Sequence, residues 1–118
     1  MSENKKPTKS SVLDAVFGQA KNLAELINYS DDSVVSKTII NKSVGTITLF
    51  AFDAGQGLSE HQAPYDAVVQ VVDGNAVLVI DGKDVKAAAG EIVIMPANIP
   101  HSVRADEKFK MLLTMIRA

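Results

Sequence analysis

Residues 55–74 read GQGLSEHQAPYDAVVQVVDG, and residues 90–101 read GEIVIMPANIPH. Each stretch opens on a glycine, and each carries one of the two histidines of the chain, His61 and His101. Runs of β-branched residues alternate with glycine, proline and aspartate, a pattern typical of short strands joined by tight turns. The two stretches therefore predict a β domain, and they hold the residues best suited to form a site.

The sequence on either side continues the strand pattern. We expect strands at 34–40, 46–52, 67–72, 76–80, 83–86, 91–95 and 108–117, and a further short strand starting at His101. Between them we expect a loop at 53–60, a turn at 73–75 and a hairpin at Asp81 and Gly82. Many short strands with almost no helix between them predict an all-β sandwich or barrel over residues 34–117.

A helical segment precedes the strands. Apolar residues recur at helical spacing over residues 12–28, which predicts one amphipathic helix or two short ones. Gly18 weakens the case for a continuous helix. Residues 1–10 are polar, and we expect them to form a disordered tail, followed by a single domain over residues 11–118.

Composition and charge narrow the classes of function. A net charge of −2 offers no electrostatic basis for binding nucleic acid or an acidic membrane surface. The absence of cysteine excludes disulfides, thiolate zinc sites and cysteine nucleophiles. No apolar run approaches the roughly 20 residues of a membrane span, and the first residues lack the apolar core of a secretory signal. We therefore expect a cytoplasmic protein.

The spacing of glycine, proline and histidine resembles the two signature motifs of the cupin superfamily. These motifs have the forms G-x5-H-x-H-x3-E-x6-G and G-x5-P-x-G-x2-H-x3-N. Read onto this chain, the first runs from Gly55 to Gly74 and the second from Gly90 to Ala105, with 15 residues between them, as in the compact single-domain members. The resemblance covers about residues 34–117. It implies an all-β, double-stranded β-helix (jelly-roll) barrel with the short helical segment outside it.

Four motif positions depart from the cupin pattern. The second histidine, the glutamate, the glycine and the asparagine are replaced by Ala63, Ala67, Asn98 and Ala105, respectively. In cupins the histidines and the glutamate together hold one divalent metal, and alanine cannot ligate. The resemblance thus implies a degenerate metal motif. In it, only His61 and His101 would hold iron, manganese, nickel, copper or zinc, weakly or not at all.

Three other polar residues near His61 in sequence are candidates for the site. Glu60 or Asp66 would be the third metal ligand, although Glu60 directly precedes His61 and neighbouring strand residues point to opposite faces. Gln56 lies in the loop expected at the barrel mouth. Together with the two histidines it is a candidate ligand-binding residue.

Two functions stay open at this point. The first is a small-molecule-binding barrel in which His61 and His101 donate hydrogen bonds to a small molecule, for example an anion, while Ala63 and Ala67 widen the cavity. The alternative is a metal-dependent cupin enzyme, such as a dioxygenase or isomerase, that acts on a small polar metabolite. Neither identifies a catalytic residue or a substrate.

We also expect a homodimer. The resemblance implies one, and a small sheet domain has edge strands that need cover or pairing. Symmetric dimers are the commonest closed assembly. The helical segment at 12–28 lies outside the barrel motif, so it is suited to cover an edge or to cross to a partner.

Overall fold

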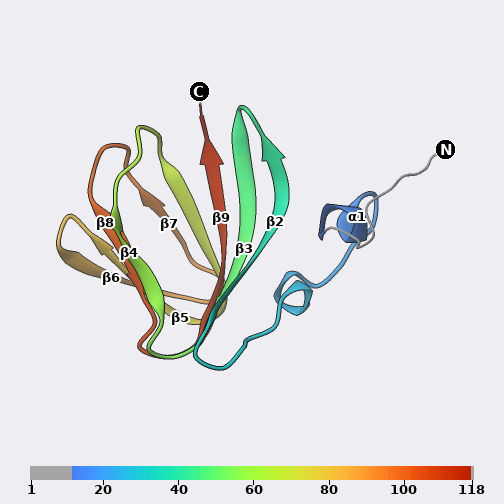
Figure 1. Ribbon diagram of the computed structural model, residues 1–118, viewed down its shortest axis with the longest axis horizontal. Helices are drawn as coiled ribbons and strands as arrows, with labels where there is room; N and C mark the ends of the chain where they lie inside the picture. The colour runs from blue at the N-terminus through green and yellow to red at the C-terminus, as the bar shows by residue number, and fades with distance from the viewer. Residues whose placement is uncertain (1–11, 118) are drawn as a thin grey trace.

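The computed structural model describes residues 12–117. In this part of the chain one short α-helix and one 3-10 helix precede eight strands, all paired antiparallel (Figure 1). The elements are α1 (Val12–Val16), η1 (Leu23–Leu26), β2 (Val34–Lys42), β3 (Gly45–Phe52), β4 (Gly57–His61), β5 (Ala67–Ile80), β6 (Lys83–Ala88), β7 (Ile92–Met95), β8 (His101–Arg104) and β9 (Phe109–Ile116). The expected all-β jelly roll with a short helical segment is confirmed. The disordered tail expected at 1–10 lies outside the described residues.

The strands form one curled sheet that β5 divides into two halves. The first half of β5 pairs with β9 and β7, and β3 and β2 continue the sheet beyond β9; we call this the long sheet. The second half of β5 pairs with β6 and β8, and β4 pairs with β8; we call this the short sheet. The two sheets face each other as a half-barrel (Figure 1).

The turn expected at 73–75 is wrong, because β5 runs straight through it. The register between β5 and β9 shifts between Val71 and Asp73, and Gly74 has a φ of 73°. A Cβ atom at Gly74 would lie 2.4 Å from the main-chain oxygen of Lys108. Glycine is needed here for a bulge that carries β5 from the long sheet into the short one.

Two further expectations concern the hairpin after β5 and the loop before β4. Asp81 and Gly82 have φ values of 51° and 77°, which confirms the hairpin between β5 and β6. The loop expected at 53–60 is wrong in its second half, where β4 begins at Gly57. Only Leu58 of this edge strand is partly buried. The sequence here therefore lacks the alternation of apolar and polar residues that would predict a strand.

Two apolar cores lie on opposite faces of the long sheet. Phe52, Val71 and Phe109 belong to the inner core, which fills the half-barrel, and the Phe52 and Phe109 rings stack at 4.6 Å. Leu49 and Ala51 belong to the outer core, where Ile27 packs on them; all three are fully buried. Period-two alternation along β3 therefore buries both of its faces.

The N-terminal arm (residues 12–30) covers part of the outer face of the long sheet. It contains two short helices, as expected, with Gly18 between them at a φ of 72°. Polar contacts hold it down: the Tyr29 hydroxyl donates to Asp73 at 2.5 Å, and Lys110 Nζ donates to the carbonyl of Ala24 at 2.6 Å. No helix of the described chain is long and apolar enough to cross a membrane.

Candidate functional site

His61 and His101 lie side by side at the ends of two paired strands. They are directly opposite each other in the register of β4 and β8, so their side chains project from the same face. The ring centroids are 4.5 Å apart, and the rings meet edge to face at 77°. The fold thus brings together two histidines that are 40 residues apart in the sequence.

Both imidazoles make the same hydrogen bond to the main chain. Nδ1 of His61 lies 2.8 Å from the carbonyl oxygen of Ser59, and Nδ1 of His101 lies 3.0 Å from that of Ile99. A carbonyl only accepts, so Nδ1 must carry the proton in each ring. In the neutral form, each ring then presents the lone pair of Nε2, which is the arrangement found in metal-ligating histidines.

The two histidines differ in their exposure. His101 is 3% exposed, whereas His61 is exposed. Burial lowers the pKa of His101 below its ordinary value of 6.5, and the neighbouring His61 lowers it further, against a smaller opposite effect from the Ile99 carbonyl. Because a lowered pKa favours the uncharged ring, His101 keeps its Nε2 lone pair at neutral pH.

The structure does not bring the other candidate residues to this pair. In the described residues no third His, Cys, Asp or Glu joins the histidines in a group that could hold a metal ion, so neither Glu60 nor Asp66 supplies that ligand. Asp66 instead accepts a hydrogen bond from the amide of Ala97 at 2.9 Å. The main-chain carbonyl of Gln56 accepts a hydrogen bond from the amide of Ala105 at 2.9 Å, at the opposite end of β4 from His61.

The alanine that replaces the family glutamate does not open a cavity. Ala67 is 2% exposed, and its cross-strand neighbours are Met95 and Met115. All three belong to the inner core or pack against it. The expectation that Ala67 widens a ligand cavity is therefore wrong, because methionine side chains, which fill irregular gaps, occupy that part of the core.

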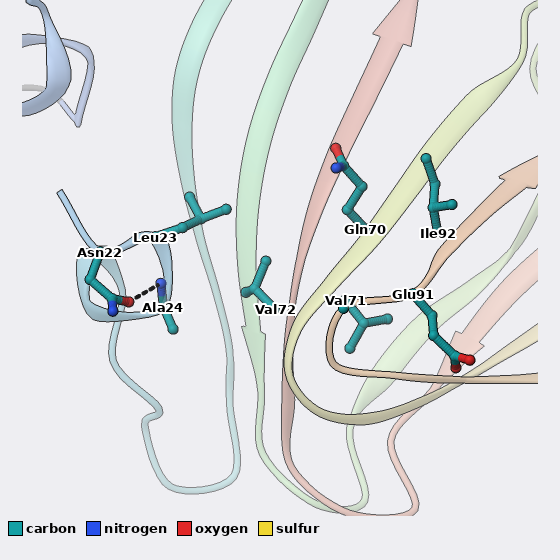
Figure 2. Close-up of a pocket in the computed structure, with 9 residues that line it drawn as sticks. Asn22, Leu23, Ala24, Gln70, Val71, Val72, Glu91 and Ile92 are labelled. Carbon is teal, nitrogen blue, oxygen red and sulfur yellow. Dashed lines mark hydrogen bonds between the residues drawn. The ribbon is translucent and has the colours of Figure 1, made fainter. Parts of the chain in front are cut away.

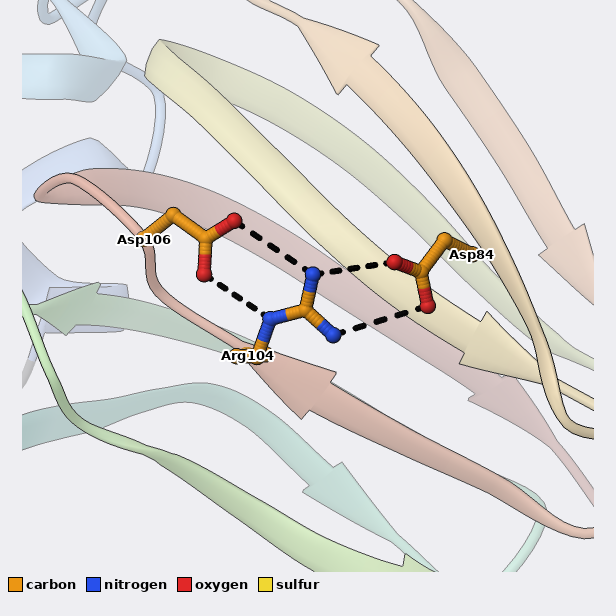
Figure 3. Close-up of polar contacts among 3 residues, drawn as sticks. All are labelled: Asp84, Arg104 and Asp106. Atoms are coloured by element: carbon orange, nitrogen blue, oxygen red, sulfur yellow. Dashed lines mark hydrogen bonds and ion pairs between the residues drawn. The ribbon is translucent and has the colours of Figure 1, made fainter.

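A second polar cluster lies on the short sheet and has a structural explanation. Arg104 on β8 contacts Asp84 of β6 at 2.9 Å and Asp106 at 2.8 Å (Figure 3). These contacts raise the pKa of Arg104 and lower that of Asp106. All three side chains are about half exposed, so the network links strand β8 to β6 without forming a sheltered site.

Neither histidine lines any of four hollows, of about 190 to 420 Å³, that are among those on the described surface. One of about 340 Å³ lies between the N-terminal arm and the loop before β7, where Asn22, Gln70 and Glu91 supply its polar groups (Figure 2). The Glu91 carboxylate there accepts a hydrogen bond from the Ala88 amide. The histidine pair is therefore a site at the end of two strands and not the floor of one of these hollows.

The groups that orient the histidines could not be found in the sequence. They are the main-chain carbonyls of Ser59 and Ile99, each two residues before its histidine. Every residue carries a carbonyl, so no side-chain type marks them. Only the path of the backbone at the end of β4 and just before β8 aims them at the rings.

Comparison with known proteins agrees with this architecture. The family model of the cupin domain matches residues 48–117. A conserved protein of unknown function from Streptococcus pyogenes is 30% identical, with a TM-score of 0.85 over 95% of this chain and 98% of its own. A cupin superfamily protein from Desulfitobacterium hafniense is 25% identical, with a TM-score of 0.81 over 85% of this chain and 92% of its own.

A longer relative is closer in sequence. A Cupin 2 conserved barrel domain protein from Leptotrichia buccalis is 41% identical, with a TM-score of 0.79 over 81% of this chain. The present chain spans about half of that protein, 47% of its length. No protein with a curated description matches the chain. The domain match, the similar structures and the curled antiparallel sheet together establish that the chain belongs to the cupin family.

Proposed function

We propose that the protein binds a small ligand at His61 and His101, and that the two Nε2 atoms hold a divalent transition metal weakly. One observation carries the proposal: both rings donate Nδ1–H to a carbonyl, which leaves two neighbouring Nε2 lone pairs free to ligate. Imidazole nitrogen suits iron, nickel, copper and zinc. We also include manganese because the cupin motif allows it.

The same observation changes how a ligand would be recognised. A neutral ring whose Nδ1 already donates to the backbone offers an acceptor at Nε2 and no further donor. The sequence led us to expect that the two histidines donate hydrogen bonds to a small molecule, and neutral rings of this tautomer fit that expectation poorly. A metal ion, or the hydroxyl or ammonium group of a small molecule, suits two adjacent acceptors.

Weak metal binding follows from the number of ligands. Firm transition-metal sites use three or four protein ligands, and only two imidazoles meet here among the described residues. A bound metal would supply Lewis acidity to an oxygen of a small ligand at its open positions. His101, which is buried, would fix the site, while His61 lies on the exposed side from which a ligand enters.

A second candidate is a metal-dependent cupin enzyme that acts on a small polar metabolite. It is favoured by the same pair, because two protein ligands leave several coordination positions for substrate and solvent. Ala63 and Ala67 replace the side chains that would complete the family's ligand set, so the binding function is the better supported of the two.

Metal content before and after substitution tests the proposal. We expect elemental analysis and calorimetric titration with nickel or zinc to show weak binding that is lost in both His61→Ala and His101→Ala. Gln56→Ala is the matched control and should bind as the wild type does, since Gln56 lies at the other end of β4. Metal that survives both histidine substitutions would place the site elsewhere. A wild type that takes up none of the metals would remove the metal from the proposal.

A further inference from the structure

The loop between β7 and β8 carries the carbonyl that orients His101. We call it the 96–100 loop, and within it the Ile99 carbonyl oxygen lies 3.0 Å from Nδ1 of His101. The partner of Nδ1 decides which nitrogen of the ring keeps the proton. The tautomer of His101 therefore depends on where the fold holds this loop.

Three hydrogen bonds tie the 96–100 loop to other parts of the fold. Each joins one main-chain group of the loop to a group outside it. They run from the Ala97 amide to the Asp66 carboxylate at 2.9 Å, from the Asn98 amide to the Ala63 carbonyl at 2.7 Å, and from the Asp81 amide to the Pro100 carbonyl at 2.9 Å. Ile99 lies between the second and the third of these bonds, so its carbonyl is held from both sides.

Only one of the three bonds uses a side chain. The pairing of β5 with β7 ends at Ala67 and Met95, and in the same register the next pair would be Asp66 and Pro96. Proline has no amide hydrogen with which to continue the ladder. The Asp66 carboxylate instead accepts the next amide along the chain, that of Ala97. The side chain at position 66 therefore decides whether the loop is held at the end of β7.

Asp66 connects the loop to a rigid part of the molecule. The adjoining pair, Ala67 and Met95, is 2% and 3% exposed and belongs to the inner core. Asp66 does not join the histidines in a metal-holding group of the described residues. Any influence of its carboxylate on His101 must therefore pass through the 96–100 loop.

The same loop is also tied to the segment that follows the other histidine. Ala63, whose carbonyl accepts the Asn98 amide, lies two residues after His61. Asn98 has a φ of 62°, a left-handed conformation that asparagine tolerates in turns. The ring of His61 itself is oriented by the Ser59 carbonyl, which lies before it in β4. The loop thus orients His101 but does not supply the acceptor for His61.

We infer that Asp66 is a positioning residue for the histidine pair. By holding the 96–100 loop, its carboxylate keeps the Ile99 carbonyl on Nδ1 of His101, which leaves Nε2 of that ring free to ligate. The consequence for metal binding rests on the function proposed above. The consequence for the tautomer of His101 does not.

The His101 tautomer in the metal-free protein tests the inference. Asp66→Ala removes the acceptor, so long-range proton–nitrogen NMR at about pH 7.5 should show a population of His101 protonated at Nε2, while His61 stays protonated at Nδ1. Asp66→Asn keeps a side-chain oxygen that can accept the Ala97 amide, and it should retain the wild-type tautomer. A His101 ring that stays wholly protonated at Nδ1 in Asp66→Ala would overturn the inference.

Glu91→Ala is the matched control. The Glu91 carboxylate also accepts a main-chain amide, that of Ala88 at 2.7 Å, but Glu91 lies at the opposite end of β7 from the 96–100 loop. This variant loses the same kind of bond, and His101 should keep its wild-type tautomer. A change in His101 as large as that in Asp66→Ala would show general loosening of the fold and contradict a specific role for Asp66.

Metal affinity separates this inference from the proposed function. If the wild type binds nickel or zinc, Asp66→Ala should raise the dissociation constant about tenfold, the lower end of the cost of losing a group that orients a ligand. Asp66→Asn and Glu91→Ala should bind as the wild type does. Unchanged affinity in Asp66→Ala would contradict the inference. A wild type that binds neither metal would contradict the proposed function, and the His101 tautomer would then decide the role of Asp66 alone.

Hydrogen exchange of the wild type keeps the inference testable if Asp66→Ala fails to fold. The Ala97 amide is expected to be protected from exchange, because the Asp66 carboxylate accepts it. Exchange of this amide at the rate of a free peptide would show that Asp66 does not hold the loop, and the inference would fail.

Discussion

At the scale of single residues, hydrogen bonds decide what the histidines can do. An imidazole that donates from Nδ1 has fixed its tautomer, and both rings of the pair do so toward a carbonyl two residues earlier. His61 is the last residue of β4 and His101 is the first residue of β8, yet the backbone before each ring places a carbonyl at the same sequence distance from it. Their chemistry as a pair of acceptors is therefore built by the main chain rather than by neighbouring side chains.

Asp53 gives a prediction about acid stability. Its carboxylate accepts the amide of Asp32 at 2.8 Å, and this bond, with a second from the Ala54 amide, holds the pKa of Asp53 below its ordinary value of 3.8. A lowered folded pKa contributes stability that is present above pH 3.8 and is lost as the pH falls through the folded pKa. We expect Asp53→Asn to be less stable than the wild type near neutral pH, and the difference to close under acid conditions.

Urea denaturation at a series of pH values measures this difference. Asp31→Asn, in the turn whose Asp32 amide donates to Asp53, is the matched control, because in the described structure no hydrogen bond uses the Asp31 carboxylate. A deficit of Asp53→Asn that is the same at all pH values would show that the charge of Asp53 has no part in it.

At the scale of elements, β5 determines the architecture. It belongs to both sheets, and the bulge at Gly74 lets one strand change sheets without a loop. The positive φ of Gly74 and its contact with the Lys108 carbonyl are two separate demands for glycine. A side chain would violate both.

Replacing Gly74 tests this role against a matched glycine. Gly82 also has a positive φ, of 77°, but a Cβ there would meet nothing within 4 Å. Gly82→Ala should cost only backbone strain, about 1 kcal/mol of unfolding free energy. Gly74→Ala should cost at least about 1 kcal/mol more, because main-chain atoms must move. Equal losses of stability in chemical denaturation would mean that the close approach at Gly74 carries no energetic weight.

The same element shows where sequence patterns stop being informative. Asp81-Gly82 and Asp73-Gly74 look alike locally, and both glycines have positive φ, yet only the first pair reverses the chain. The difference lies in the partners: β9 and β6 pair with β5 on either side of Gly74 and keep it extended. A hairpin is set by nearby residues, whereas a bulge depends on strands distant in the sequence. Strand β4 was not predicted because it lies at the edge of the sheet, where Gly57, Ser59 and Glu60 are exposed and give no apolar pattern.

At the scale of the whole molecule, the N-terminal arm belongs to the fold. Strands β2 to β9 span residues 34–116, which is 83 of 118 residues or about 70% of the chain, whereas the match to the Streptococcus pyogenes protein covers 95%. That match therefore extends beyond the strands into the arm. The helical spacing over residues 12–28 predicted an apolar side, but the outer face of the long sheet that receives it was not visible in the sequence.

Ile27 is the residue through which the arm should stabilise the fold. It is fully buried on Leu49 and Ala51, so Ile27→Ala removes methyl groups and leaves a cavity. We expect a loss of about 2–4 kcal/mol in unfolding free energy. Glu25→Ala, exposed in the same arm, should change stability by less than about 0.5 kcal/mol. If the two variants proved equally stable in urea denaturation, the arm would not be part of the cooperative unit.

The candidate site was partly predictable at this scale. The cupin spacing identified His61 and His101, and the fold places their rings in contact. The motif spacing could not reveal that Met95 and Met115 lie beside Ala67, because that packing depends on how β5, β7 and β9 pair.

Nitrogen-detected or long-range proton–nitrogen correlation NMR of the imidazole rings tests the central claim most directly. The chain has only two histidines, so each ring nitrogen gives a signal that single substitutions assign. At about pH 7.5 both rings should show a protonated Nδ1 and an unprotonated Nε2, and zinc should shift both Nε2 signals while Nδ1 stays protonated. A protonated Nε2 on either neutral ring, or Nε2 signals that zinc leaves unchanged, would contradict a two-histidine ligand site.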